Sequence, residues 1–290
     1  MPAFAHTVAV VNRAAGGGAV RRIWSRMLAA IVEQTEGRLT IEWTPAAGAA
    51  SALTRSALQS GADRILAVGG DGTVHEVVNG FFDDDGQPIA PEAVLAPLPC
   101  GTGGDFRRAL GLPSSGVRAA RNLSRAPTRR LDLVRVTCAG PEGRPCTTYV
   151  ANASSCGLGG AVVQTVHRLP VHGGAYLGSA GGTLAYFGAI LYSLATTTPD
   201  VLSIMADGQS LGQMEAWTVA VANGPSFGGG LRIAPHAELD DGWFDVVCLG
   251  GVSVGYLLRH ALSFYRGRHL DLDPVRTFRA HQLRLEPTGD

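Results

Sequence analysis

The sequence contains no lysine. Its 290 residues include 24 basic side chains, all of them arginine, against 24 aspartates and glutamates, so the formal net charge is zero. The absence of lysine excludes a Walker A loop, a protein-kinase strand lysine, Schiff-base chemistry and a Ser-Lys dyad, because each of these requires a lysine amine. If the protein binds phosphate, it must do so with backbone N–H groups, arginine and metal ions.

Charged residues are also scarce, and the cysteines form no recognisable motif. Charged residues make up 17% of the chain, and the neutral balance argues against a nucleic-acid partner. The five cysteines form no CxxC pair, which favours a reducing compartment over a disulfide framework or a zinc ribbon. No HExxH motif is present, and the N-terminal residues indicate a first strand, not a signal peptide.

One stretch resembles a membrane span at first sight. Residues 169–199 contain no Asp, Glu, Lys or Arg, and Tyr176–Thr198 is moderately apolar. A transmembrane helix needs about 20 predominantly apolar residues, whereas four glycines dilute this stretch. We therefore predict a helix that faces a core or an apolar cleft, and no transmembrane span.

The first 110 residues alternate strand and helix signals. Short apolar runs predict strands at Val8–Val11, Leu39–Trp43, Ile65–Val68 and Val94–Leu98. Helical periodicity predicts helices over residues 20–32, Ala46–Gln59 and His75–Phe82. This alternation is typical of a doubly wound α/β fold with a mostly parallel sheet.

From about Leu131 the pattern becomes β-rich. Short β-branched runs separated by turns predict an antiparallel sheet or sandwich, with strands at Leu131–Val136, Thr147–Ala153, Val201–Met205, Ala216–Ala222 and Phe244–Leu249. A further helix is predicted at Val252–Tyr265. We therefore expect two domains, an α/β nucleotide-binding domain over residues 1–128 and a β-rich domain over residues 129–290.

Three glycine clusters follow predicted strands in the first domain. They are Gly16–Gly18, Gly69–Gly72 within the run GGDGT, and Gly101–Gly104. Ligands of open α/β sheets bind outside the carboxyl ends of the strands, where glycines let backbone N–H groups surround an anion. One cluster alone could be a tight turn, but several on neighbouring strands favour a phosphate site.

Asp71 lies inside the second cluster. A carboxylate beside a triphosphate is repulsive unless a divalent cation bridges the two, so Asp71 is a candidate for a metal-linked or transfer-site residue. A helix-capping role is the alternative. In the absence of lysine, Mg²⁺ and arginine must neutralise the transferred group, and Arg107 or Arg108 follows the third cluster. Replacement of Asp71 by alanine should then abolish transfer and leave unfolding nearly unchanged.

The run GGDGTVHEVVNG, from Gly69 to Gly80, closely resembles the signature of the diacylglycerol kinase and sphingosine kinase superfamily, in its bacterial soluble branch. Four further stretches resemble that family in the same order, namely Asn12–Gly16, Pro97–Pro113, Leu131–Val134 and Gly228–Asp245. GGDGT alone is shared with NAD kinases. The combination is highly specific, and it covers essentially the whole chain.

The resemblance implies an ATP- and Mg²⁺-dependent lipid kinase that phosphorylates a hydroxyl of a diacylglycerol-like lipid. Such an enzyme would be cytoplasmic and peripheral at the inner membrane face, with the lipid as its partner. Nucleotide contacts are implied for Asn12, Arg13, Ala14, Ala15, Gly16, Thr44, Gly69, Gly70, Asp71, Gly72, Thr73, Val74, His75, Glu76, Gly101 and Thr102.

The resemblance also implies a catalytic network and a metal site. Asp105, Arg108 and Asp132 match charged residues that the family places near Asp71. The side chain of Asp241 matches a metal-binding aspartate, with the carbonyls of Glu238 and Trp243 as co-ligands. An ordinary β-turn at residues 240–242 is the alternative for that segment.

The sequence departs from the family at several positions. His75 and Gly104 stand where asparagine is usual, and Gly17 stands where a basic residue is common, so Arg13 or Arg108 must supply the positive charge there.

A family Asp-Gly-Glu that resembles the catalytic base region is absent, and it should fall just past Asp290. We therefore expect that the chain is truncated there and lacks its last strands, which leaves the base unassigned. An NAD kinase-like enzyme and a catalytically inactive nucleotide- or lipid-binding protein remain as alternatives. The lipid and the oligomeric state, a homodimer included, stay open.

Overall fold

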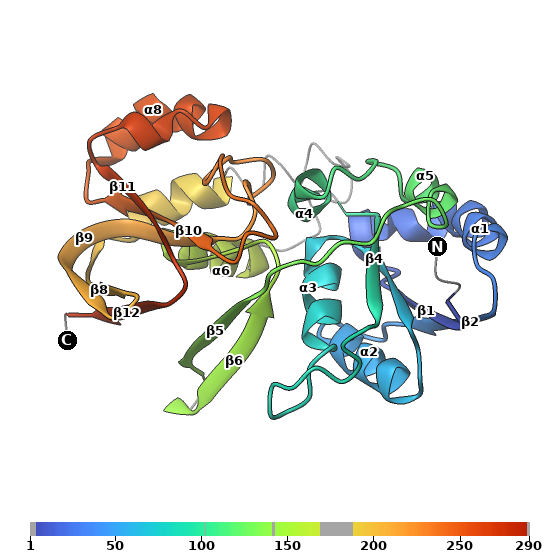
Figure 1. The fold of residues 1–290 in the computed structure, drawn as a ribbon. Coiled ribbons are helices and arrows are strands. Elements are labelled where there is room, and N and C mark those ends of the chain that lie inside the picture. Colours follow the sequence, from blue (N-terminus) through green and yellow to red (C-terminus); the bar gives the residue numbers. More distant parts are fainter. Residues whose placement is uncertain (1–3, 102, 141–142, 169–187, 289–290) are drawn as a thin grey trace. The chain divides into compact units, whose positions relative to one another are not determined.

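The computed structural model describes residues 4–101, 103–140, 143–168 and 188–288 (Figure 1). The chain forms two compact units. The first unit contains Met1–Arg130 and Arg135–Val150, and the second contains Leu131–Val134 and Ala151–Asp290. This division differs from the predicted boundary at 128/129 because residues 135–150 return to the first unit.

A four-stranded parallel sheet with the order β2-β1-β3-β4 forms the centre of the first unit. Its strands are β1 (His6–Val11), β2 (Arg38–Trp43), β3 (Arg64–Gly69) and β4 (Val94–Pro99). The apolar run from Val8 to Val11 is buried, as expected for a parallel strand that is covered on both faces. The predicted doubly wound α/β fold is confirmed.

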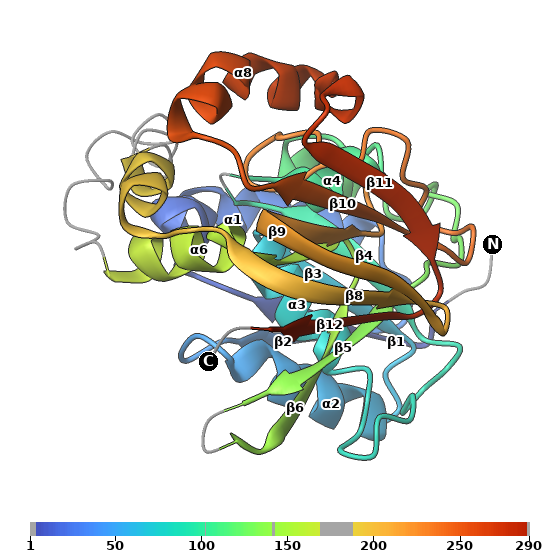
Figure 2. The same cartoon turned by 90° about the vertical axis from the view of Figure 1, so that its left-hand side faces the viewer.

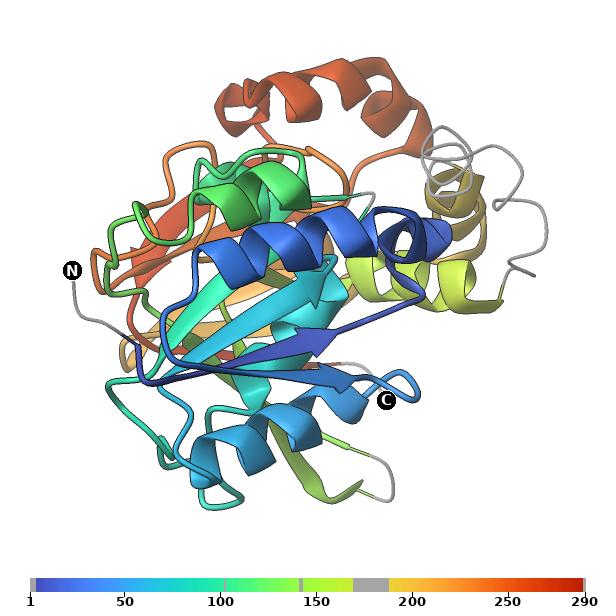
Figure 3. The ribbon, with the colours of Figure 1, turned by 90° about the vertical axis from the view of Figure 1, so that its right-hand side faces the viewer.

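Helices cover both faces of this sheet. They are α1 (Ala15–Glu33), α2 (Ala49–Gln59), α3 (Asp71–Asn79), α4 (Asp105–Ala109) and α5 (Gly116–Arg121). Figure 3 shows α1 and α5 on one face and α2 on the opposite face, where α2 packs against α3. Met27 and Ile31 of α1 are fully buried against Leu66 and Leu98 of the sheet. The helices thus leave the carboxyl ends of the strands to the loops.

A two-stranded hairpin, β5 (Val134–Ala139) and β6 (Pro145–Val150), extends the first unit. Asn79, the last residue of α3, donates its side-chain amide to the Tyr149 carbonyl (2.9 Å) and accepts the Tyr149 N–H (2.8 Å). The rings of Phe82 and Tyr149 stack with centroids 3.7 Å apart. The hairpin is therefore fastened to the end of α3.

An antiparallel sheet dominates the second unit, with the order β11-β10-β9-β8-β12 and with β7 paired to β9 (Figure 2). The strands are β7 (Ala153–Gly157), β8 (Asp200–Ala206), β9 (Gln209–Ala222), β10 (Phe244–Gly250), β11 (Val275–Ala280) and β12 (Leu283–Pro287). Its helical segments include α6 (Leu158–Arg168), α8 (Val254–Arg266) and the 3-10 turn η3 (His269–Asp271). The predicted β-rich second half is confirmed.

Some predicted elements differ from the structure. The single strand predicted over Thr147–Ala153 is wrong, because the chain leaves β6 at Val150 and enters β7 at Ala153. The carbonyl of Asn152 accepts the amides of Asn223 and Gly224 between them (2.7 and 2.8 Å). The sequence pattern also missed β11 and β12.

The uncharged stretch lies partly outside the described residues. Of the helix predicted over Tyr176–Thr198, the described residues 188–196 are helical. In the described parts of the chain, no helix has the length and apolar character that crossing a membrane requires.

Candidate functional site

The second and third glycine clusters lie side by side because the neighbouring strands β3 and β4 end in them. Gly69 pairs with Pro99 in the strand register, and the amide of Cys100 donates to the Gly69 carbonyl (N···O 2.7 Å). A Cβ atom on Gly101 would lie 2.5 Å from the Cα atom of Gly70, far inside van der Waals contact. Only glycine at position 101 allows the two loops to approach this closely.

The first glycine cluster joins them from the end of β1. The side-chain amide of Asn12 donates from Nδ2 to Thr73 Oγ1 (3.1 Å), and its Oδ1 accepts the Ala14 N–H (2.9 Å). Gly16 adopts a left-handed φ of 60°, and a Cβ there would lie 2.3 Å from the Cys100 carbonyl oxygen. Three glycine-rich loops therefore converge at the carboxyl ends of β1, β3 and β4, as the sequence predicted.

Asp71 links two of these loops. It begins α3, and its carboxylate accepts the N–H groups of Asp105 (3.1 Å) and Phe106 (3.3 Å) at the start of α4. A negative charge at this position is favourable because the first N–H groups of a helix have no partner within the helix. Asp71 also lines a narrow recess with Gly70 and Gly101. Asp71 therefore caps the start of α4, and its role in phosphate transfer stays a prediction.

The arginines near the loops differ in their partners. Arg108 pairs with the buried Asp105 (Nη2···Oδ1 2.6 Å) and donates to the Gly103 carbonyl (2.9 Å). Arg107 donates to the Leu112 carbonyl (3.2 Å). Both side chains therefore stabilise the segment that follows the third cluster.

Arg13, in the first loop, is held differently. Its guanidinium carbon lies 3.9 Å from the centroid of the Trp43 ring, at the end of β2, which is a close cation–π contact. Among the described residues, Arg13 forms no ion pair with a carboxylate. Its positive charge is therefore available to an anionic ligand.

The remaining predicted nucleotide contacts lie around the same loops. Thr44 follows β2 and donates its amide to the Val11 carbonyl (3.0 Å). Glu76 accepts the Ala50 N–H (3.0 Å) and thereby holds the start of α2. Val74 is 7% exposed, and its amide donates to the Gly70 carbonyl (3.1 Å). Thr102 lies outside the described residues. Ala15, Gly72 and Thr73 lie at or beside the ends of β1 and β3.

Two titratable side chains next to the loops, His75 and Cys100, are neutral near pH 7. Burial lowers the pKa of His75, and the nearby Glu76 raises it by less. Burial raises the pKa of the Cys100 thiol to about 11. The departure at His75 therefore adds no charge to the site near pH 7.

The departure at Gly104 has a conformational reason. Its φ of 66° is left-handed, a region that glycine enters freely and asparagine tolerates better than other residues. Glycine here and asparagine in the family can thus hold the same backbone. This geometry sets the direction in which α4 leaves the loop.

Asp132 belongs to the second unit. Its amide donates to the Leu239 carbonyl (2.8 Å), and its carboxylate accepts the Gly242 N–H (2.6 Å). The structure thus brings Asp132 to the turn that contains Asp241. A role of Asp132 beside Asp71 stays a prediction.

The predicted metal site at Asp241, Glu238 and Trp243 stays a prediction, and in this structure protein groups contact its carboxylate. One carboxylate oxygen of Asp241 is paired with the guanidinium of Arg279, and the other accepts the Trp243 N–H (3.0 Å). Arg279 Nε also lies 4.0 Å from Asp245 Oδ2. The described residues contain no group of three His, Cys, Asp or Glu side chains that could hold a metal. In this structure the Arg279 guanidinium contacts the carboxylate that was predicted to bind the cation.

Sequence reasoning missed Trp43 and Arg279. The available signal for Trp43 was its position, because it is an aromatic residue at the end of a predicted strand and directly before the predicted contact Thr44. Arg279 meets Asp245 through the antiparallel register of β10 and β11, and a single sequence gives no signal for that pairing.

Two family profiles match the chain. Residues 6–136 match the diacylglycerol kinase catalytic domain, and residues 155–290 match the YegS C-terminal NAD kinase beta sandwich-like domain. The chain is 29% identical over 270 residues to a diacylglycerol kinase of Bacillus subtilis, covering 91% of this chain and 82% of the relative. It is 30% identical over 234 residues to a diacylglycerol kinase of Staphylococcus epidermidis, covering 81% and 67%.

A solved structure has the same fold. The crystal structure of a diacylglycerol kinase from Bacillus anthracis superposes with a TM-score of 0.70 at 24% identity, covering all of this chain and 88% of the other. The two profiles, which follow one another along the sequence, and the relatives establish the family, and the solved structure shows the same fold. The chain belongs to the diacylglycerol kinase family of lipid kinases, which are phosphotransferases with an alcohol acceptor.

Proposed function

We propose that the protein transfers the γ-phosphate of ATP, with Mg²⁺, to a hydroxyl of a diacylglycerol-like lipid. The observation that carries this proposal is the convergence of three glycine-rich loops on Asp71 at the carboxyl ends of β1, β3 and β4. Backbone N–H groups at such a position suit phosphate, and a single carboxylate there suits a transfer site. Family membership and the diacylglycerol kinase names of the relatives support the lipid acceptor.

Asp71 fits a magnesium ligand. Each of its carboxylate oxygens accepts one backbone N–H, which leaves further lone pairs free. Protein-bound Mg²⁺ in phosphotransfer sites takes only one or two carboxylates, with phosphate and water oxygens completing its shell. Bound there, the ion would neutralise phosphate charge. The loops would orient the nucleotide, and Arg13 would add positive charge.

The acceptor hydroxyl would lose its proton to a carboxylate. The lipid is a component of membranes, so we place the reaction at the cytoplasmic membrane surface, with the protein bound peripherally. The NAD kinase-like alternative shares GGDGT, but the relatives reported above carry diacylglycerol kinase names. The inactive-binder alternative rests on the missing Asp-Gly-Glu.

A transfer assay separates these functions. Purified protein is incubated with γ-labelled ATP and, in parallel, dioctanoylglycerol, monoacylglycerol, sphingosine, ceramide, phosphatidylglycerol or NAD, and products are resolved by thin-layer chromatography. We expect label in the diacylglycerol product, none in NAD, and no product when EDTA replaces Mg²⁺.

Each of the other outcomes would support a different function for this protein. Label in NADP would favour the NAD kinase-like enzyme. Calorimetric binding of ATP without any labelled product would identify an inactive nucleotide-binding protein. Undiminished transfer in EDTA would contradict the metal dependence.

Arg13 should contribute to nucleotide affinity through its free charge. We expect Arg13→Gln to weaken binding of Mg-ATP about tenfold, the low end of what a charge-assisted hydrogen bond supplies. Trp43→Leu should have a smaller effect in the same direction, because it removes only the surface that positions the guanidinium. Isothermal titration calorimetry measures both.

The matched control is Arg21→Gln, which removes an exposed arginine of the same α1 region and should leave affinity within twofold. Equal affinity of the Arg13→Gln variant and the unmodified protein would show that Arg13 does not face the nucleotide.

A further inference from the structure

Helix α8 carries a stripe of exposed apolar side chains along one face. Leu258, Leu262 and Tyr265 are 47%, 66% and 40% exposed, at positions i, i+4 and i+7 of the helix. Residues with this spacing lie on one face. A different face holds the helix in place, because Leu257 and Phe264 pack into the core against Val247 and Val275. The stripe is therefore surplus to what holds the helix in place.

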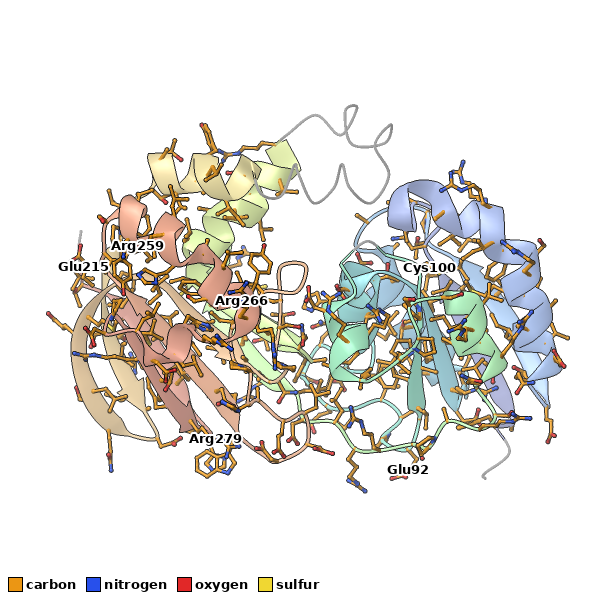
Figure 4. All side chains as sticks on the ribbon, turned by 90° about the horizontal axis from the view of Figure 1, so that it is seen from above. Glu92, Cys100, Glu215, Arg259, Arg266 and Arg279 are labelled. Carbon is orange, nitrogen blue, oxygen red and sulfur yellow. The ribbon has the colours of Figure 1, made fainter. Side chains whose placement is uncertain are left out.

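Arginines frame the stripe. Leu262, its most exposed member, has Arg259 at i−3 and Arg266 at i+4, and both arginines are exposed. Figure 4 labels both along α8. Neither forms an ion pair among the described residues, and Glu215, labelled near Arg259, is not paired with it. Residues 246–270 contain no Asp or Glu at all. In a chain of zero net charge, this face is locally positive.

We propose that this face of α8 docks on the surface of an anionic phospholipid bilayer. Helices that lie in a membrane interface combine apolar side chains with arginine or lysine beside them, so that the apolar groups enter the acyl boundary and the cations meet lipid phosphates. Arginine suits this because its long apolar stem lies along the lipid surface while its head contacts phosphate. The proposed function supplies only the reason for such docking, which would bring the enzyme to a lipid substrate.

Vesicle binding tests the surface without using catalysis. The full chain is mixed with an excess of vesicles made either of phosphatidylcholine alone or of phosphatidylcholine with about 40 mol% phosphatidylglycerol. The bound fraction is measured by flotation at about 50 and 500 mM salt. We expect binding to the anionic vesicles, weakening in high salt, and little binding to pure phosphatidylcholine.

Two variants separate the apolar and the charged contributions. Arg259→Gln with Arg266→Gln should lower the partition coefficient about 25-fold, since each basic residue near an anionic surface contributes about fivefold. Leu258→Gln with Leu262→Gln should lower it at least about tenfold, and glutamine keeps a helix propensity close to that of leucine. The control pair Leu211→Gln and Arg276→Gln removes exposed residues of β9 and β11 and should change it less than twofold.

The readouts distinguish this proposal from the proposed function. All variants should phosphorylate water-soluble dioctanoylglycerol as the unmodified chain does, and only the α8 variants should lose activity on long-chain lipid in vesicles. If no lipid is phosphorylated, the proposed function fails while vesicle binding is still decided. Equal vesicle binding by the α8 variants and the control overturns the docking surface. A change from dimer to monomer in the leucine variant, without a change in vesicle binding, would assign the face to a second copy of the chain instead.

Discussion

Replacing Asp71 by asparagine is expected to lower phosphate transfer by roughly a thousandfold, the scale associated with losing one electrostatic group of a transfer site. Asparagine keeps the shape and one acceptor oxygen but removes the charge that would hold Mg²⁺. The affinity for ATP without metal should change little. Initial rates in the labelled-ATP assay, with nucleotide affinity from calorimetry, measure both effects.

Asparagine is a better replacement than alanine because Asp71 also stabilises the fold. Its two hydrogen bonds to Asp105 and Phe106 hold the start of α4. Alanine should therefore lower the free energy of unfolding by about 1 kcal/mol, as loss of a helix cap does. The sequence alone predicted no such loss. Transfer by the asparagine variant at the rate of the unmodified protein would remove Asp71 from the transfer site.

A second large effect is expected for Gly101→Ala. The added methyl group would lie 2.5 Å from Gly70 Cα and 3.3 Å from Gly70 N, and both are backbone atoms that cannot rotate away. Overpacking of this kind costs about 1–3 kcal/mol, which corresponds to a fall in Tm of about 3–10 °C for a chain of this size. Mg-ATP binding should be lost because the loops would separate. Thermal unfolding and calorimetry measure the two effects.

Gly72→Ala is the matched control for stability. A Cβ at Gly72 would meet no atom within 4 Å, and its φ is not left-handed. Alanine in the first turn of α3 should leave Tm unchanged or raise it slightly. If Gly101→Ala unfolds at the same temperature as Gly72→Ala and binds nucleotide normally, the close contact of the two loops is not required.

The first unit could be predicted further than the second for a physical reason. A parallel strand such as Val8–Val11 is covered on both faces, so it is a continuous apolar run that stands out in the sequence. In contrast, β11 has the sequence VRTFRA, and only Val275 and Ala280 of it are buried. A strand with one exposed face and two arginines resembles a surface loop in composition.

The site shows the same limit. Glycine-rich loops after strands are visible locally, so the positions of Gly69–Gly72 and Gly101–Gly104 were predictable. The partner of each polar group was not. Arg108 was a candidate for phosphate charge, but its pairing with Asp105 follows from how α4 turns after Gly104. The approach of Arg279 to Asp245 depends on a register between strands that the sequence does not state.

The hairpin β5–β6 has a consequence for how the protein behaves in concentrated solution. A two-stranded ribbon presents unpaired backbone groups, and such an edge can template pairing with another chain. At Tyr149 the amide of Asn79 satisfies both the N–H and the carbonyl, while the ring lies on Phe82 and its hydroxyl donates to the Gly86 carbonyl (3.0 Å). The Asn79 side chain thus makes the two backbone hydrogen bonds that a neighbouring strand would otherwise make at Tyr149. At Tyr149 the edge therefore offers neither its N–H nor its carbonyl to a strand of another molecule.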